Sequence, residues 1–218
     1  FVRMLGLARG TTLPFISNRI ISNKTYQRQN RNDGRPAVVL LLDIYARFFE
    51  PEIGHAAISV LEKSGYDIFL VFLDESPRVL ISYGLLPEAK MTLIKQIDLL
   101  ARFDGLPIVG LEPSELLTLK DEAVDLVGAD MRSRAELISR QCYLFEDFFE
   151  DIKSEKKIFK QYFDKWNNKY QVHVHCHQKS LTGTASALSV IKGIPGATAE
   201  IINTGCCGMA GSFGYKYH

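Results

Sequence analysis

The sequence predicts an α/β protein that consists of two related Rossmann-like modules with parallel sheets, the second of them incomplete. Continuous apolar runs, which are typical of strands buried on both faces of a parallel sheet, alternate with amphipathic helical segments. The two halves also share a strand–helix–strand pattern, which indicates an internal duplication. The chain is expected to divide into a connecting segment, a first module, a set of connecting helices and a second module: 1–35, 36–132, 133–170 and 171–218.

The first module contains three predicted strands with helices between them. Its strands are the apolar runs AVVLLLDIY, DIFLVFL and LPIVGLEPS. Pro51 opens a helix after the first strand, and Gly65 ends it. Further helices are predicted over 87–105 and 115–127. Because strands and helices of this length alternate, we expect βαβ units and a parallel sheet.

The remaining chain is predicted to be helical at first and then to return to alternation. The segment 133–170 is strongly charged, and Phe148, Ile152, Phe159 and Phe163 share one face of its last helical stretch. We expect this apolar stripe to pack on the core, and a partner-binding helix is the alternative. The second module follows with a strand at YQVHVHCH, a helix at GTASALSVIKGIPG and a strand at ATAEIINTG.

The composition excludes several classes of protein. The 218 residues are 46% hydrophobic and 23% charged, and the net charge of +1 argues against a nucleic-acid-binding protein. No apolar run reaches the roughly 18 residues of a membrane-spanning helix, and no signal-peptide pattern is present. The four cysteines do not form the pattern of a disulfide framework. We therefore expect reduced thiols in a cytoplasmic protein, or in one held peripherally at the cytoplasmic membrane. Because the first residue is Phe1, we also expect a piece of a longer protein.

The evidence for duplication is an alignment of the two halves. AISVLEKSGYDIFLVFLDE over 57–75 aligns with ALSVIKGIPGATAEIINTGC over 187–206 when one residue is inserted. Upstream, VVLLLDIY is similar to VHVHCHQK, and with the two segments offset by one residue Asp43 occupies the position of Cys176. A duplicated strand–loop–helix–strand unit explains both the similarity and the spacing.

Three cysteines are predicted to converge at one edge of the second sheet. Cys176 and the adjacent pair Cys206 and Cys207 follow its two strands, and the carboxyl ends of parallel strands meet at one edge. Adjacent cysteines bridge poorly, since their Cα atoms lie about 3.8 Å apart. We therefore expect metal ligands, either for an iron–sulfur cluster or for zinc. Flanking glycines would let backbone N–H groups approach the sulfur atoms of a cluster: Gly205, Gly208 and Gly211.

Histidines alternate around the first of these cysteines. His173 and His175 share one face of the predicted strand, and His175 and His177 flank Cys176. Because imidazole and thiolate ligands together bind zinc, a structural zinc site is the alternative to iron. A nucleophilic Cys176 assisted by a histidine is less favoured, since adjacent residues of a strand point apart. Cys142 lies in a helical pattern and is expected to be a core residue.

Two segments of the second half, HCHQK and GCCGMAGSFG, resemble the cysteine-rich (CCG) domain family, and LDIYARFFEPEIGHAAISVLEKSGY and IVGLEPSELLTLKDE extend the resemblance upstream. The family includes a cysteine-rich subunit of heterodisulfide reductase and the iron–sulfur subunit of glycolate oxidase. The resemblance is closest to the C-terminal iron–sulfur region of FAD-linked D-lactate dehydrogenase-type oxidoreductases. It implies that the parent protein oxidises a 2-hydroxy acid at FAD, and that this region passes the electrons on through a [4Fe–4S] cluster.

The resemblance also implies a ligand set and partners. Cys176, Cys206 and Cys207 match ligand positions of the family, and a further family cysteine would lie beyond His218. FAD would bind outside this region, and the partners would be a flavin-containing dehydrogenase domain or subunit and a downstream electron acceptor. No catalytic residue is expected here, so the chain alone should not be an active enzyme. The alternative is a zinc-stabilised or apo module that docks subunits and has no redox activity.

The first module departs from the family at its ligand positions. Glu75, Ser76 and Pro77 replace the Cys-Cys-Gly of related proteins, and Glu115 replaces a later cysteine. Together with Asp43, these acids would suit a hard cation if they met. The favoured interpretation is a site that has lost its metal, with the acids solvated or paired with Arg78.

Overall fold

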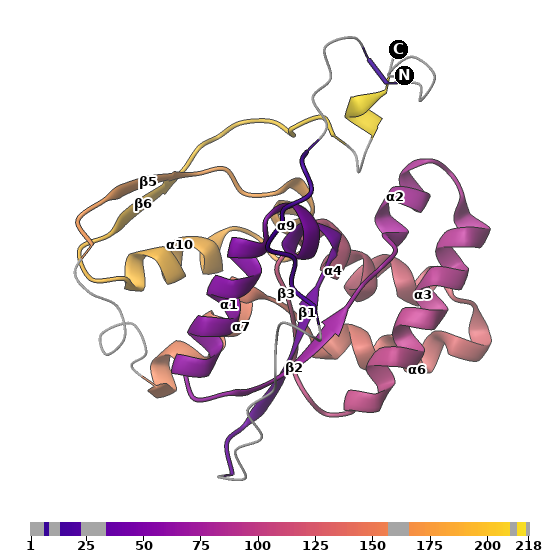
Figure 1. The fold of residues 1–218 in the computed structure, drawn as a ribbon, viewed down its shortest axis with the longest axis horizontal. Coiled ribbons are helices and arrows are strands. Elements are labelled where there is room, and N and C mark those ends of the chain that lie inside the picture. The colour runs from indigo at the N-terminus through magenta and orange to yellow at the C-terminus, as the bar shows by residue number, and fades with distance from the viewer. Residues whose placement is uncertain (1–6, 9–13, 23–33, 157–165, 210–212, 217–218) are drawn as a thin grey trace.

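The structure is a computed structural model, and Figure 1 shows a four-stranded parallel sheet between helices with a smaller two-stranded parallel sheet beside it. The described residues are 7–8, 14–22, 34–156, 166–209 and 213–216. Among these residues, no helix is long and apolar enough to cross a membrane.

The larger sheet has the strand order β2-β1-β3-β4, and all neighbours are parallel. Its strands are β1 (Ala37–Leu42), β2 (Asp67–Phe72), β3 (Ile108–Gly110) and β4 (Cys142–Leu144). From its second residue onward β1 is buried on both faces, which explains its continuous apolar sequence. The predicted α/β fold with a parallel sheet is confirmed.

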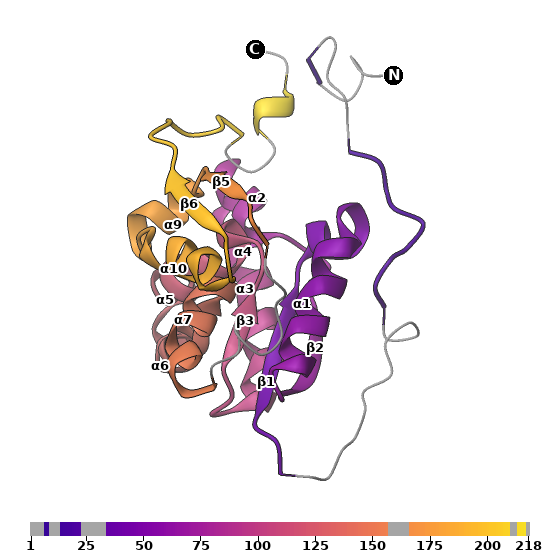
Figure 2. The same cartoon turned by 90° about the vertical axis from the view of Figure 1, so that its left-hand side faces the viewer.

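Helices cover both faces of this sheet (Figure 2). One face packs on α3 and α6, where Leu93 and Ile97 are fully buried, and the other packs on α1 and α7, where Leu61 and Phe149 are buried. The helical segments of this unit are η2 (Tyr45–Phe49, a π-helix), α1 (Pro51–Lys63), α2 (Pro77–Ser82), α3 (Leu86–Leu100), η3 (Ala101–Phe103, 3₁₀), α4 (Pro113–Leu117), η4 (Thr118–Glu122, a π-helix), α5 (Ala123–Leu126), α6 (Ala129–Gln141) and α7 (Phe145–Lys156).

Helix α1 forms as its sequence predicts. Pro51 stands at its first position, where the missing N–H costs nothing, and Gly65 follows its end with a φ of 83°. Gly54 lets the helix approach η2 and Ile21 closely, since a Cβ there would lie 2.6 Å from Cδ1 of Ile21. Ile21 belongs to the segment predicted to be a solvated connection, yet its side chain is completely buried.

The second unit consists of β5 (Lys169–Val172), α9 (Cys176–Leu181), α10 (Ala185–Gly193) and β6 (Thr198–Ile201), followed by the short 3₁₀-helix η5 (Phe213–Tyr215). Its strands pair in parallel and in step, from Lys169 opposite Thr198 to Val172 opposite Ile201. The unit contacts the larger one through α10 on α7 and through α9 on α4. These contacts bring the ends of β5 and β6 close to the first module.

Two parts of the structure differ from the sequence-based expectations. The strand predicted over 170–177 ends at Val172, and His175 caps α9, so that Cys176 begins a helix. A short strand, β4, interrupts the segment predicted to be wholly helical. In α7, Phe148 is buried and Ile152 is partly buried, as predicted for the apolar stripe. Two further predicted members of the stripe lie outside the described residues: Phe159 and Phe163.

Candidate functional site

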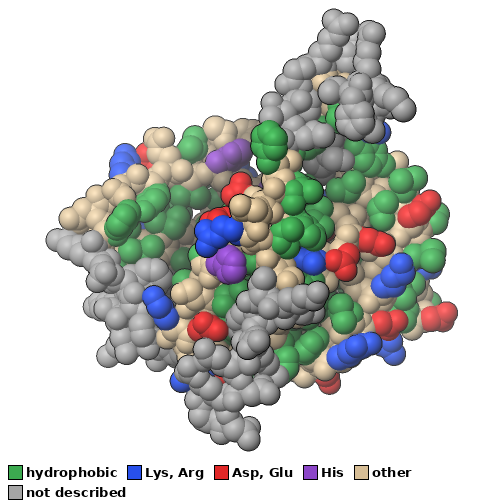
Figure 3. Space-filling view, viewed as in Figure 1, with side chains coloured by type: hydrophobic (Ala, Val, Ile, Leu, Met, Phe, Trp, Pro, Cys, Tyr) green, Lys and Arg blue, Asp and Glu red, His purple; other side chains and the backbone are tan. Residues whose placement is uncertain are grey.

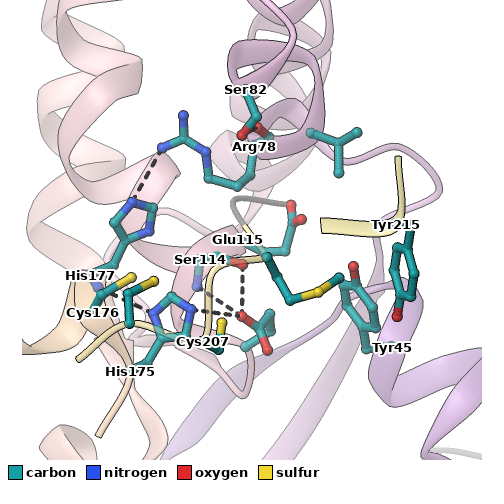
Figure 4. Close-up of a pocket in the computed structure, with 14 residues that line it drawn as sticks. Tyr45, Arg78, Ser82, Ser114, Glu115, His175, Cys176, His177, Cys207 and Tyr215 are labelled. Carbon is teal, nitrogen blue, oxygen red and sulfur yellow. Dashed lines mark hydrogen bonds and ion pairs between the residues drawn. The ribbon is translucent and has the colours of Figure 1, made fainter. Parts of the chain in front are cut away.

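A cavity of about 470 Å³ lies where α2 and α4 of the larger unit meet α9 and the chain after β6. Figure 4 shows His175, Cys176, His177 and Cys207 on one side of this cavity, with Tyr45 and Tyr215 opposite. In the space-filling view, acidic, basic and histidine side chains gather near the middle of the face shown in Figure 3. The residues that line the cavity carry thiol, carboxyl, imidazole and guanidinium groups, and they lie at the carboxyl ends of strands, where α/β proteins bind ligands.

The structure brings the three predicted cysteines to this cavity. Cys176 is the first residue of α9, Cys206 and Cys207 lie in the chain after β6, and all three are free and exposed. The thiols of Cys176 and Cys206 lie close enough to influence each other's pKa. The parallel pairing of β5 and β6 explains this convergence, because it places both strand ends at one edge of the sheet.

The two neighbouring thiols have different local environments, which shift their pKa values in opposite directions. The backbone N–H of Gly208 donates to Sγ of Cys206 over 3.4 Å and is the main cause that lowers the pKa of Cys206. Burial is the main cause that raises the pKa of Cys176. Gly208 has a φ of 77°, a conformation that glycine adopts without strain. Of the other predicted glycines, Gly205 accepts a hydrogen bond from Nε2 of His173 at 3.0 Å through its carbonyl, and Gly211 lies outside the described residues.

The two predicted histidines line the cavity but have different surroundings. Nδ1 of His175 accepts a hydrogen bond from the backbone of His177 at 3.2 Å and so caps α9, while its Nε2 lies 4.0 Å from a carboxylate oxygen of Glu112. Burial is the main cause that lowers the pKa of His175. Nε2 of His177 lies 3.4 Å from a guanidinium nitrogen of Arg78, and its buried Nδ1 has no partner among the described residues. In the described part of the chain, no three or more His, Cys, Asp and Glu side chains are grouped so that they could hold a metal ion.

The three acids of the first module do not come together as the alternative of a hard-cation site would require. Asp43 accepts hydrogen bonds from the backbone N–H groups of Tyr45 (2.7 Å) and Ala46, which fixes the turn after β1. Glu75 turns away from the cavity and accepts a hydrogen bond from Thr92 at 2.8 Å. Glu115 lines the cavity alone of the three.

The environment of Glu115 is unusual for a carboxylate. One oxygen accepts a hydrogen bond from Ser76, and the other, also buried, has no partner among the described residues. Burial, followed by the nearby carboxylates of Asp43 and Glu112, raises its pKa to about 7. Of the acids that we expected to be solvated or paired with Arg78, Glu75 is exposed, whereas Asp43 and Glu115 are buried and Arg78 forms its ion pair with Glu122.

Sequence reasoning missed several groups around the cavity. Glu112 lies two residues after the end of β3, so the rule for carboxyl ends of strands would have found it. Tyr45 belongs to the π-helical turn after β1, and Tyr215 reaches the site from η5, where no sequence pattern indicated an approach. Tyr45 and Tyr215 give the cavity an aromatic wall opposite the thiols.

Comparison with known proteins finds relatives among dehydrogenases. The chain is 28% identical to a D-2-hydroxyglutarate dehydrogenase of Pantoea ananatis over 182 residues, which are 82% of this chain and 17% of that protein. It is 22% identical to one subunit of the anaerobic glycerol-3-phosphate dehydrogenase of Escherichia coli over 179 residues, 79% of this chain and 43% of that subunit. No protein-family model and no solved structure matches. The chain therefore spans less than half the length of these curated relatives, and it is related to a segment of larger dehydrogenase proteins.

Proposed function

We propose that this chain is the electron-transfer segment of a longer FAD-linked oxidoreductase that acts on 2-hydroxy acids such as D-lactate or glycolate. The observation that carries the proposal is the convergence of Cys176, Cys206 and Cys207 on one cavity, in a chain related to dehydrogenases. A flavin domain or subunit would supply the electrons, and a separate acceptor would take them. We assign the protein to the cytoplasm, where thiols stay reduced.

The residues present suit part of an iron–sulfur site. Thiolates are the usual ligands of [4Fe–4S] clusters, and three exposed ones line this cavity. Gly208 already donates its N–H to Sγ of Cys206, the kind of bond that tunes the potential of a cluster. A bound cluster would supply one-electron redox chemistry, and the chain would orient it through Cys176 on α9 and through the loop after β6. The fourth thiolate is proposed to come from a segment outside this chain.

We further infer that the two units descend from one duplicated unit whose first copy has lost its thiols. Each unit has a parallel strand pair joined through helices, β1 with β2 and β5 with β6. Asp43 follows β1 directly, and Cys176 is the fourth residue after β5. The modules 36–132 and 171–218 remain our proposed boundaries.

A zinc-stabilised module without redox activity is the second candidate. His177 favours it, because this residue lines the cavity together with Cys176 and its buried Nδ1 has no partner in the described part of the chain. Zinc would then be held by cysteine and histidine and would tie α9 to the loop after β6. This module would dock the subunits of the oxidoreductase.

Metal and acid-labile sulfide analysis of anaerobically purified protein separates the two candidates. The measurement is made on the full-length protein that contains this chain and on the chain alone. Iron and sulfide in equal amounts that are lost in Cys206→Ser, but kept in Cys142→Ala, would support the iron–sulfur function. Stoichiometric zinc that is lost in His177→Ala would support the second candidate. Absence of iron and sulfide from the full-length protein would overturn the first.

A further inference from the structure

We propose that Cys176 and Cys206 form a redox-active dithiol, which low-molecular-weight disulfides such as glutathione disulfide convert to an intramolecular disulfide. The bond itself needs only the two thiols and no metal. Its consequence for metal uptake rests on the proposed function, because it would remove two of the three thiolates from the site.

The fold holds the two cysteines at the same place. Strands β5 and β6 run parallel and end in step, with Val172 opposite Ile201. Cys176 follows the first strand end by four residues and Cys206 follows the second by five, so both reach the same end of the sheet. Both line the same cavity there, and their thiols lie close enough to influence each other's pKa.

Two contacts keep the loop after β6 next to α9. Nζ of Lys179 donates to the carbonyl of Thr204 over 3.1 Å, and Nε2 of His173 lies 3.0 Å from the carbonyl of Gly205. Between these anchors and Gly208 the backbone has no regular structure, and Gly205 has open space where a Cβ would be. The loop can therefore adjust to the geometry that a bond between the sulfur atoms requires.

The geometry also selects this pair among the cysteines. Cys206 and Cys207 are adjacent, and their Cα separation of about 3.8 Å is shorter than the roughly 4.4–6.8 Å that disulfides prefer. Cys142 is completely buried in β4 and is out of reach of solvent oxidants. Among the described thiols, Cys176 is the exposed one that lies near Cys206 without being its neighbour in the sequence.

The exchange balances in two steps. The thiolate of Cys206 attacks one sulfur of glutathione disulfide, breaks the S–S bond and releases one glutathione thiolate. The thiolate of Cys176 then attacks Sγ of Cys206 and displaces the second glutathione. Two protein thiols lose two electrons and two protons in total, and glutathione disulfide becomes two molecules of glutathione.

Peptide mapping of metal-free protein tests the inference. The full-length protein is reduced, freed of metal with a chelator, treated with glutathione disulfide, alkylated and digested. We expect a linked pair of peptides containing Cys176 and Cys206, with alkylated Cys207, and full reversal by a reductant. Cys207→Ser should keep the linked pair, whereas Cys176→Ser should stop after the first step and carry one glutathione on Cys206. Three outcomes would overturn the inference: glutathione retained separately on both cysteines, a link between Cys206 and Cys207, or no change in any thiol.

Iron uptake is measured separately, so that the two proposals can fail independently. After reconstitution with iron and sulfide, the oxidised protein should bind less than about a tenth of the iron that the reduced protein binds, because the site needs free thiolates. A linked pair of peptides without iron uptake in either state would keep the disulfide and reject the cluster. Iron uptake without any linked pair of peptides would keep the cluster and reject the disulfide.

Discussion

The side chain of Ser76 donates a hydrogen bond to Glu115 and so joins the start of α2 to the first turn of α4. The same hydroxyl accepts the backbone N–H of Val79 at 3.2 Å and caps α2. Ser76 thus serves two helices, and both helices line the cavity.

Ser76→Ala should lower the free energy of unfolding by roughly 1–3 kcal/mol, since it removes a helix cap and leaves a buried carboxyl oxygen without its donor. Urea denaturation at constant pH measures the change. Ser82→Ala is the matched control, because the hydroxyl of Ser82 bonds only the carbonyl of Arg78 within the same helix, and we expect a change within about 0.5 kcal/mol. Equal losses in the two variants would contradict the dual role of Ser76.

The protonation of Glu115 should make stability fall as the pH rises. The folded pKa is raised to about 7 from the ordinary 4.5, mainly by burial, so the native state holds a proton that the unfolded chain has released. The resulting stability is complete below about pH 4.5 and is lost as the pH approaches 7, by on the order of 3 kcal/mol.

Glu115→Gln isolates this effect, because its amide keeps an acceptor for Ser76 and does not titrate. Urea denaturation of both proteins at several pH values between about 4.5 and 7.5 gives the comparison. The variant should gain stability relative to the wild type as the pH rises through this window. A constant difference across the window would show that Glu115 titrates normally.

The ion pair between Arg78 and Glu122 is expected to couple α2 to the π-helical segment η4. Both side chains are largely buried, with 12% and 28% of their surface exposed, and Arg78 also contacts His177 of the second unit. Arg78→Met and Glu122→Gln should each destabilise the protein, since each leaves the other charge without its partner. A double-mutant cycle in urea should give a coupling of about 1–3 kcal/mol, and additive losses would contradict it.

Much of the fold could be predicted because its signal is local. The apolar runs of β1 and β2 and the Pro51 start of α1 need no long-range information. Strand β4 was missed because it is short, lies between α6 and α7, and forms only by pairing with β3, which is distant in the sequence. Short strands of this kind depend on tertiary contacts rather than on their own sequence.

The sequence predicted those parts of the site whose positions follow from the ends of the strands. The three cysteines follow β5 and β6, so their convergence followed from a parallel sheet. The alternating histidines suggested a strand, but His175 instead caps α9. A cap forms when a side chain, rather than the backbone, accepts a hydrogen bond from a backbone N–H group, and the alternation of residue types does not indicate this. Glu75 aligns with Cys206, so its carboxylate was expected near the corresponding site of the first module. Instead it accepts a hydrogen bond from Thr92 on α3 and points away from the cavity.

Thiol counting should distinguish Cys142 from the other cysteines. Cys142 has no exposed surface, and burial raises its pKa to about 12, whereas the remaining three cysteines are exposed. A disulfide reagent such as DTNB should therefore modify three thiols in reduced, metal-free native protein and the fourth only after unfolding. Cys142→Ala should leave the native count unchanged. Modification of all four thiols in the native protein would show that β4 opens readily.

Gly110 is expected to be essential for the approach of α4 to β3, which positions Glu112 and Glu115 at the cavity. A Cβ at this position would lie 2.8 Å from Cβ and from Cδ1 of Leu116, a fully packed neighbour. Gly110→Ala should therefore cost about 1–3 kcal/mol of stability through overpacking.

Gly205→Ala is the matched control for this change, since a Cβ there meets nothing within 4 Å and the φ is not positive. Its effect on the free energy of unfolding should stay within about 0.5 kcal/mol. Urea denaturation compares the two variants at the same pH. Equal stability of Gly110→Ala and Gly205→Ala would contradict this prediction. It would show that Leu116 leaves space for a Cβ at position 110, and that the position of Glu115 does not depend on a glycine there.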